Sequence, residues 1–321
     1  MKFLLVCLFF SLSPLASSMT LEDFFMSKGA NSICQKALTV SSHGIRKQHL
    51  RFVTGDMQQV YFVFNYNDYA EVEVFNTYTE KWRTLKFKEK IVDITLDKSE
   101  ALFLTPKNLL SADRETFQLN YQFPTLPKNI SYFKHAYASG LVKAGNDFYI
   151  AHGKYGVVKY DKENRNYHIF KPEVPQPQSG HISLLVDIHK KDDLLYLSYD
   201  DLTLARKSKA FEGVVLWSLK EDKVSDIIPL NQRKEGYYRP HFISDNARQE
   251  TLYIANFNLL FKHDLTEIPG SRYMWPNKRI WKHSAGDAIG RLMILDGVGY
   301  GCFEDIQAGS IGILSASLSQ L

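Results

Sequence analysis

The stretch NDFYIAHGKYGVVKYD, from Asn146 to Asp161, contains two short apolar and aromatic runs separated by His-Gly-Lys-Tyr-Gly. Short runs of this kind on either side of a Gly-containing connection are typical of a β-hairpin. A hairpin that recurs along a chain decides the fold, because each copy is then one unit of a repeat architecture. The first question is therefore whether this hairpin is repeated.

Runs similar to residues 148–151 recur along the whole chain. Their central aromatic residues are 42 to 57 residues apart: Tyr61, Phe103, Tyr149, Tyr196, Tyr253 and Tyr300. Each copy follows one apolar run and precedes another, which often ends in an acidic residue, and most copies have a fourth run. Four short strands per unit, bounded by Gly, Asn, Asp and Pro, are typical of a propeller blade.

We therefore predict an all-β fold, a six-bladed β-propeller of four-stranded antiparallel blades. The last unit offers only three strands, so residues 36–42 are expected to supply the fourth and close the ring, which removes exposed sheet edges. Seven blades, a two-sheet sandwich and two domains are the alternatives. The regular spacing favours one propeller over residues 36–321, after a lead-in at 19–35 that includes a short helix.

The tail of the quoted hairpin, GKYGVVKYD, resembles the short repeats of bacterial regulator-type propellers. The wider pattern is similar to the six-bladed group that includes NHL-repeat and senescence-marker-type propellers. This resemblance covers the chain after residue 18, and it implies a fold rather than an activity.

The N-terminus predicts export. Residues 1–18 begin with Lys2, continue with the apolar run FLLVCLFF and reach small residues at Ala16 and Ser18, which is the pattern of a secretory signal peptide. Pro14 interrupts the run too early for a membrane anchor, which needs about 20 apolar residues. We expect a secreted or periplasmic protein without a membrane span.

Charge and cysteine content limit the partners and the compartment. The 39 basic and 35 acidic side chains are interspersed, whereas nucleic-acid-binding proteins cluster basic residues, so we expect a small molecule or a protein as partner.

Cys34 and Cys302 would remain after cleavage and can form a disulfide in an oxidising compartment. Two free, partly buried thiols fit the sequence equally well. Asn129 begins a glycosylation sequon that matters only in a eukaryotic host.

Three consecutive units carry a histidine 12 to 15 residues before their repeated aromatic residue, where the innermost strand is expected to begin: His135, His181 and His241. Asp287 occupies the same register in the next unit, and Tyr237, Tyr238 and Arg239 lead into His241. If these registers hold, the side chains meet at one mouth of the central channel. We therefore name them as candidate ligand-binding residues.

Imidazole nitrogens with a carboxylate suit zinc or a similar transition metal, and three protein ligands with an open position would make the site catalytic. His135, His181 and His241 are thus candidate ligands of a divalent metal. Senescence-marker-type enzymes and amidating lyases hold a metal in a six-bladed channel, but their motifs do not match residue by residue. A histidine at a strand entrance can equally serve as a hydrogen-bonding partner of the neighbouring blade.

Two functions remain open from the sequence. The first is a secreted propeller that binds a ligand or a protein through its channel mouth and rim loops. The second is a metal-dependent lyase or hydrolase with a histidine-lined channel. The motifs of serine hydrolases, P-loop proteins and dinucleotide-binding enzymes are absent from the sequence.

Overall fold

The fold is that of a computed structural model of the 321-residue chain. It describes residues 20–25, 27, 29, 32–34, 38–40, 46–48, 50–132, 137–175, 183–201, 211, 213–229, 241–244, 251–256, 259–264, 278–282, 288–289, 293–305 and 310–317. The predicted signal peptide at residues 1–18 lies outside this part of the chain. The helices found in it are all too short or too polar to cross a membrane.

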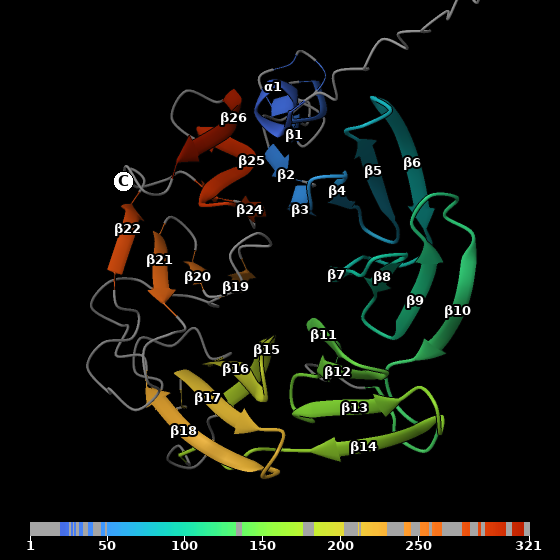
Figure 1. The fold of residues 1–321 in the computed structure, drawn as a ribbon, viewed down its shortest axis with the longest axis vertical. Helices are drawn as coiled ribbons and strands as arrows, with labels where there is room; N and C mark the ends of the chain where they lie inside the picture. The colour runs from blue at the N-terminus through green and yellow to red at the C-terminus, as the bar shows by residue number, and fades with distance from the viewer. Residues whose placement is uncertain are drawn as a thin grey trace, which may run out of the picture.

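The chain is a β-propeller built from four-stranded antiparallel sheets. The described residues form six of them, and Figure 1 shows these blades arranged around a common centre. The first blade contains β3 (Leu50–Gly55), β4 (Gln59–Asn65), β5 (Ala70–Asn76) and β6 (Lys81–Phe87), and the second contains β7 (Asp93–Leu96), β8 (Glu100–Leu104), β9 (Asn108–Asp113) and β10 (Leu119–Pro124). The third blade contains β11 (Gly140–Ala144), β12 (Asp147–Ala151), β13 (Val157–Asp161) and β14 (Asn166–Phe170), and the fourth contains β15 (Ser183–Lys191), β16 (Leu194–Asp201), β17 (Gly213–Ser218) and β18 (Lys223–Pro229). The fifth blade contains β19 (His241–Ser244), β20 (Thr251–Asn256), β21 (Leu259–Asp264) and β22 (Lys278–Lys282). The blade number of the whole ring stays a prediction.

The last sheet differs from the others. Its inner position is shared by β23 (Ala288–Ile289) and β24 (Met293–Leu295), which both pair with β25 (Val298–Asp305), and β26 (Ser310–Ser317) pairs with the other edge of β25. The three strands expected from the sequence are therefore present. The expected fourth strand is placed differently, because β1 (Leu38–Val40) pairs with β2 (Arg46–Gln48) and not with β26. A local hairpin has a smaller loop-closure cost than a pairing across the whole chain.

The N-terminus still packs at the seam between the last blade and the first. Helix α1 (Leu21–Phe25) contacts β26 and buries Phe24 and Phe25 in a cluster that includes Phe62 of β4 and Tyr300 of β25. Phe24 stacks on Phe75 at 4.1 Å, and Phe25 stacks on Tyr300 at 4.9 Å. Aromatic burial by a helix therefore joins the two blades where strand pairing was expected.

The repeated aromatic residues lie in the second strand of each blade, as the spacing predicts. Phe103 is out of register with Tyr61 and Tyr149. Tyr61 and Tyr149 each face the following blade, whereas Phe103 packs with Tyr61 and so faces the preceding blade. The residue equivalent to Tyr61 in the second blade is Leu102, one position earlier, because side chains alternate between the faces of a strand.

Candidate ligand-binding groove

The predicted channel-mouth site falls largely outside the described residues. The candidate residues outside the described part of the chain are His135, His181, Tyr237, Tyr238, Arg239 and Asp287. Only the backbone of His241 is described, as the first residue of β19. Within the part of the chain that the structure describes, no group of three or more His, Cys, Asp or Glu side chains is placed to hold a metal. The histidine site and its metal therefore stay predictions.

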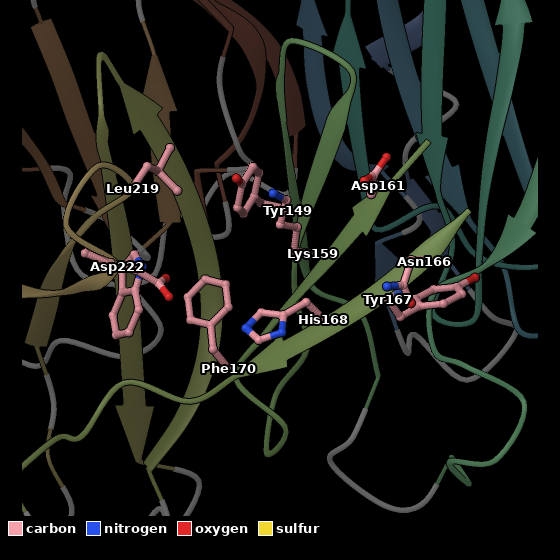
Figure 2. Close-up of a pocket in the computed structure, with 10 residues that line it drawn as sticks. Tyr149, Lys159, Asp161, Asn166, Tyr167, His168, Phe170, Leu219 and Asp222 are labelled. Carbon is pink, nitrogen blue, oxygen red and sulfur yellow. The ribbon is translucent and has the colours of Figure 1, made fainter. Parts of the chain in front are cut away.

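A groove that the sequence did not predict lies between the third and fourth blades. Its volume is about 370 Å³, and it is lined by Tyr149, Lys159, Asp161, Asn166, Tyr167, His168, Phe170, Trp217, Leu219 and Asp222. Figure 2 shows Leu219 and Asp222 reaching the groove from the fourth blade, opposite His168 and Phe170 of the third. Leu219 and Asp222 belong to the turn between β17 and β18, so the groove opens at the end of the blades where third strands turn into fourth strands. His241 begins an inner strand and pairs with Ala255, which places it at the opposite end.

One wall of the groove is a row of three side chains across the third blade. Tyr149 of β12 pairs with Lys159 of β13, and Lys159 pairs with His168 of β14. Directly paired residues point to the same face of a sheet, so all three face the fourth blade. Tyr149 is buried, Lys159 is partly exposed and His168 is exposed, so the row runs from the core to the solvent.

The second wall is aromatic. Phe170 of β14 stacks on Trp217 of β17 with ring centroids 4.7 Å apart, and His168 lies beside Phe170 at 6.0 Å. Both Phe170 and Trp217 are only partly buried, since they pack on the interblade core from its solvent side. The groove therefore has an aromatic surface that water reaches.

Opposite charges lie at the inner end of the groove. Lys159 forms an ion pair with Asp147 at 2.7 Å, and its ammonium lies over the ring of Tyr149, 5.7 Å from the centroid. The hydrogen bond with Asp147 raises the pKa of Lys159, so this side chain is a cation at neutral pH. Burial raises the pKa of Tyr149. Lys159 lowers this pKa, whereas the carboxylates of Asp147 and Asp222 raise it further, and the hydroxyl stays protonated.

These groups give the groove a defined chemistry. The Tyr149 hydroxyl and the Lys159 ammonium are hydrogen-bond donors, and the Asp222 carboxylate is an acceptor on the facing wall. Asp161 lies at the outer end, where its carboxylate accepts the backbone N–H and the side-chain amide of Asn164. An aromatic surface with a few converging polar groups is the usual composition of a small-molecule site. None of these groups is arranged as a nucleophile next to a base.

The sequence contains only weak evidence for this groove. Lys159 and His168 are polar residues at alternate strand positions, which is also the pattern of a solvent-facing strand. Their approach to Trp217 depends on how two blades face each other, and a repeat pattern does not specify that. The one usable observation is that the quoted hairpin carries Lys159 directly across from its repeated aromatic residue, Tyr149.

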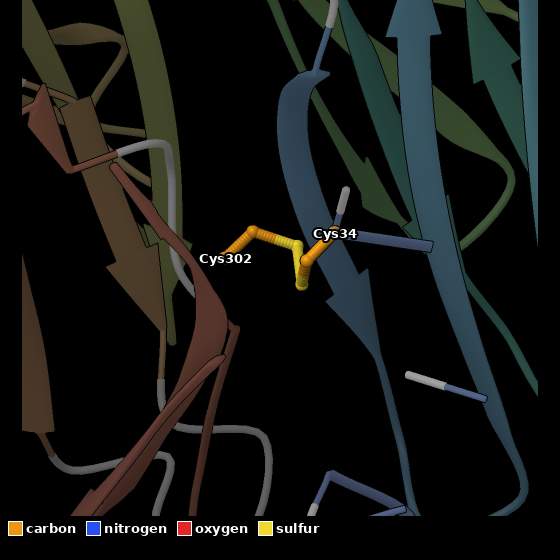
Figure 3. Close-up of a disulfide and its surroundings, with 2 residues drawn as sticks. All are labelled: Cys34 and Cys302. Carbon is orange, nitrogen blue, oxygen red and sulfur yellow. A yellow bond between two sulfur atoms is a disulfide. The ribbon is translucent and has the colours of Figure 1, made fainter. Parts of the chain in front are cut away.

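Of the two alternatives that the sequence left open for Cys34 and Cys302, the structure shows the disulfide. Cys34 and Cys302 are bonded with their Cα atoms 5.4 Å apart, although 268 residues separate them in the sequence (Figure 3). Both residues are buried in the cluster that also contains Phe24 and Phe25 of α1. The covalent bond and the helix therefore hold the same seam between the last and first blades.

Comparison with known proteins identifies no family. No family model and no curated protein matches the sequence. Among solved structures the chain is similar to BamB from Moraxella catarrhalis (8% identity, 85% of this chain and 88% of that one, TM-score 0.47). It is similar to Kuenenia stuttgartiensis hydrazine synthase (9%, 84% and 96%, TM-score 0.49) and to the computationally designed Ika8 protein (10%, 83% and 71%, TM-score 0.43). Similarities at this level say nothing about ligand or activity.

Proposed function

We propose that the protein is an exported binding module that holds a small ligand in the groove between its third and fourth blades. The observation that carries the proposal is the aromatic pair Phe170 and Trp217 at a water-accessible groove that also presents Lys159 and Asp222. A volume of about 370 Å³ is within the range of small-molecule sites, roughly 300 to 1,000 Å³.

Export is supported by two independent features. The first 18 residues have the pattern of a signal peptide, and the chain has a disulfide, a bond that persists in oxidising compartments and is rare in the cytosol. A protein acting outside the cytoplasm meets ligands of that compartment, which agrees with a role in binding.

The test is a ligand screen on the chain from Met19, using a library of neutral, anionic and cationic small molecules and saturation-transfer NMR. Trp217→Leu removes the aromatic wall, and Asp222→Asn removes the facing carboxylate. We expect groove ligands to bind both variants at least about tenfold more weakly, a loss of about 1.4 kcal/mol.

Asp192→Asn is the matched control. Asp192 and Asp222 are both exposed turn residues with φ of 51°, a backbone conformation that Asn tolerates, but Asp192 is in the β15–β16 hairpin and does not line the groove. Binding that is equal in all four proteins, or no binding of any library member to the wild type, would overturn the proposal. Far-ultraviolet circular dichroism of each variant shows whether it is folded.

The metal-dependent lyase or hydrolase remains the second function predicted from the sequence. It rests on His135, His181 and His241, with Asp287, Tyr238 or Arg239 in acid/base or substrate-orienting roles. Elemental mass spectrometry of the untagged protein tests it: about one equivalent of zinc or iron, lost in His181→Ala, would support this function. Absence of metal from both proteins after zinc is added would exclude it.

A further inference from the structure

We propose that the ligand of this groove is a neutral saccharide, bound with one face of a sugar ring against the Phe170–Trp217 wall. This inference rests on the proposed function, because it names the class of molecule that the same groove would hold. Three properties of the groove lead to it: its aromatic surface, its pairing of donors with acceptors, and its carboxylates.

The aromatic wall fits one face of a sugar ring. A pyranose has a face of C–H groups that is apolar and nearly flat, while its hydroxyl groups project around the rim. Phe170 and Trp217 stack on each other, so they offer a sugar ring the rigid apolar surface that their mutual contact leaves uncovered, with little conformational entropy to lose. Burial of the C–H face there would provide the hydrophobic part of the binding free energy.

The polar groups match the rim of hydroxyl groups. A sugar hydroxyl both donates and accepts, so it needs both kinds of partner within one site. Tyr149 and Lys159 on the third blade are donors, and Asp222 on the fourth blade is an acceptor. Asn166, at the outer end, offers one amide that does both.

The charges in the groove disfavour an anionic ligand. Asp161 and Asp222 line the groove with carboxylates that would repel it. Lys159 is already neutralised by Asp147 at 2.7 Å, so it offers a hydrogen bond rather than a net charge. A neutral molecule that uses these groups only as donors and acceptors avoids the repulsion.

The experiment titrates glucose, galactose, mannose and N-acetylglucosamine, and oligosaccharides of each, into the wild type and into Trp217→Leu, Asp222→Asn and Asp192→Asn, with calorimetry and NMR detection. We expect at least one neutral sugar to bind the wild type and Asp192→Asn equally. Its affinity should fall at least tenfold in Trp217→Leu and in Asp222→Asn. If the monosaccharide binds as tightly as its oligosaccharide, the ligand is a free sugar. If only the oligosaccharide binds, the ligand is a glycan chain.

The saccharide inference is overturned if no sugar of the panel binds, or if sugar binding survives both groove substitutions. The outcome of the broader screen then separates two cases. Molecules of another class that bind and depend on Trp217 would preserve the binding function and refute only the ligand class. If no molecule of any class depends on Trp217 or Asp222, the groove itself is not a binding site. His168→Ala, at an exposed position, provides a further groove variant should Trp217→Leu fail to fold.

Discussion

His152 illustrates how much one side chain can contribute within this fold. It directly follows β12 and is fully buried, with its Nε2 atom 3.1 Å from the Thr125 hydroxyl, while its Nδ1 atom has no hydrogen-bond partner among the described residues. Burial lowers the pKa of His152 to about 4, because the charged imidazolium would lose its hydration. The imidazole is therefore neutral in the folded protein at physiological pH.

This burial predicts that acid weakens the fold well above the range in which carboxylates titrate. In the unfolded chain a histidine takes up a proton near pH 6.5, whereas folded His152 does not until about pH 4. Its contribution is thus fully present above pH 6.5 and is lost progressively as the pH falls toward 4, by up to about 3 kcal/mol. Urea unfolding at pH 7 and pH 5 measures the difference, which should be smaller in His152→Gln.

NMR titration of the imidazole is a check that needs no variant. A His152 ring that titrates near pH 6.5 in the folded protein would contradict this prediction, and so would an equal pH dependence of unfolding in the wild type and His152→Gln.

The acidic residues that end many third strands also have a local physical reason. Asp113 and Asp161 each accept backbone N–H groups of the following turn, and so does Asn76 at the same place in the first blade. The sequence pattern that suggested blades therefore reports a turn-capping hydrogen bond, in which a short polar side chain replaces a backbone acceptor. The same bonds lower the pKa of Asp113 and of Asp161.

At the scale of elements, neighbouring blades are joined by buried polar contacts as well as by apolar packing. Arg114, which follows β9 in the second blade, forms an ion pair with Asp56 of the first blade at 2.8 Å and donates to Gln59 at 3.2 Å. Only 6% of the Arg114 side chain is exposed, so its charge depends on these partners. Tyr61 extends the network by donating to Gln59 at 2.6 Å.

Removal of this guanidinium should cost far more than removal of a surface charge. Arg114→Ala removes the guanidinium that Gln59 and Asp56 share as a donor at a largely buried interface, so we expect the free energy of unfolding to fall by about 3 kcal/mol. Lys86→Ala is the comparison, because Lys86 pairs with Glu71 at 3.5 Å while 74% of its side chain is exposed, and such pairs contribute about 0 to 1 kcal/mol. Equal losses in urea unfolding would show that the Arg114 network does not join the blades.

The elements themselves could be predicted from the sequence, but not their mutual contacts. The second strands follow from repeated aromatic residues, and the outer strands at residues 81–87, 166–170 and 278–282 from short alternating runs. The role of Arg114 could not be read, because an arginine in a polar turn sequence is usually solvated. The Phe170–Trp217 wall is similarly hidden, since which faces of two sheets meet depends on register and twist.

At the scale of the whole molecule, the seam between the last and first blades is held by α1 and the Cys34–Cys302 bond. A disulfide stabilises a fold chiefly by restricting the unfolded chain, and the effect grows with the length of the closed loop. The 268-residue separation is long enough for a stabilisation of about 5 kcal/mol on this account.

The double variant Cys34→Ser/Cys302→Ser, or reduction of the wild type, should therefore lower the free energy of unfolding by an amount of that order. Limited proteolysis should cleave first near α1, because the helix would then be held only by packing. An unchanged unfolding transition under reducing conditions, with the thiols shown to be free by mass spectrometry, would contradict the prediction.

The same bond sets an order of events during biosynthesis. Cys34 leaves the ribosome 268 residues before Cys302, which at about 5 to 20 residues per second is a delay of roughly 13 to 54 seconds. If the predicted signal peptide is removed, Cys7 leaves with it, and Cys302 is then the one other cysteine within residues 19–321. Reactions that compete with the pairing of Cys34 during this delay are then with other molecules. Formation of the native bond thus marks the moment at which the first and last blades have met.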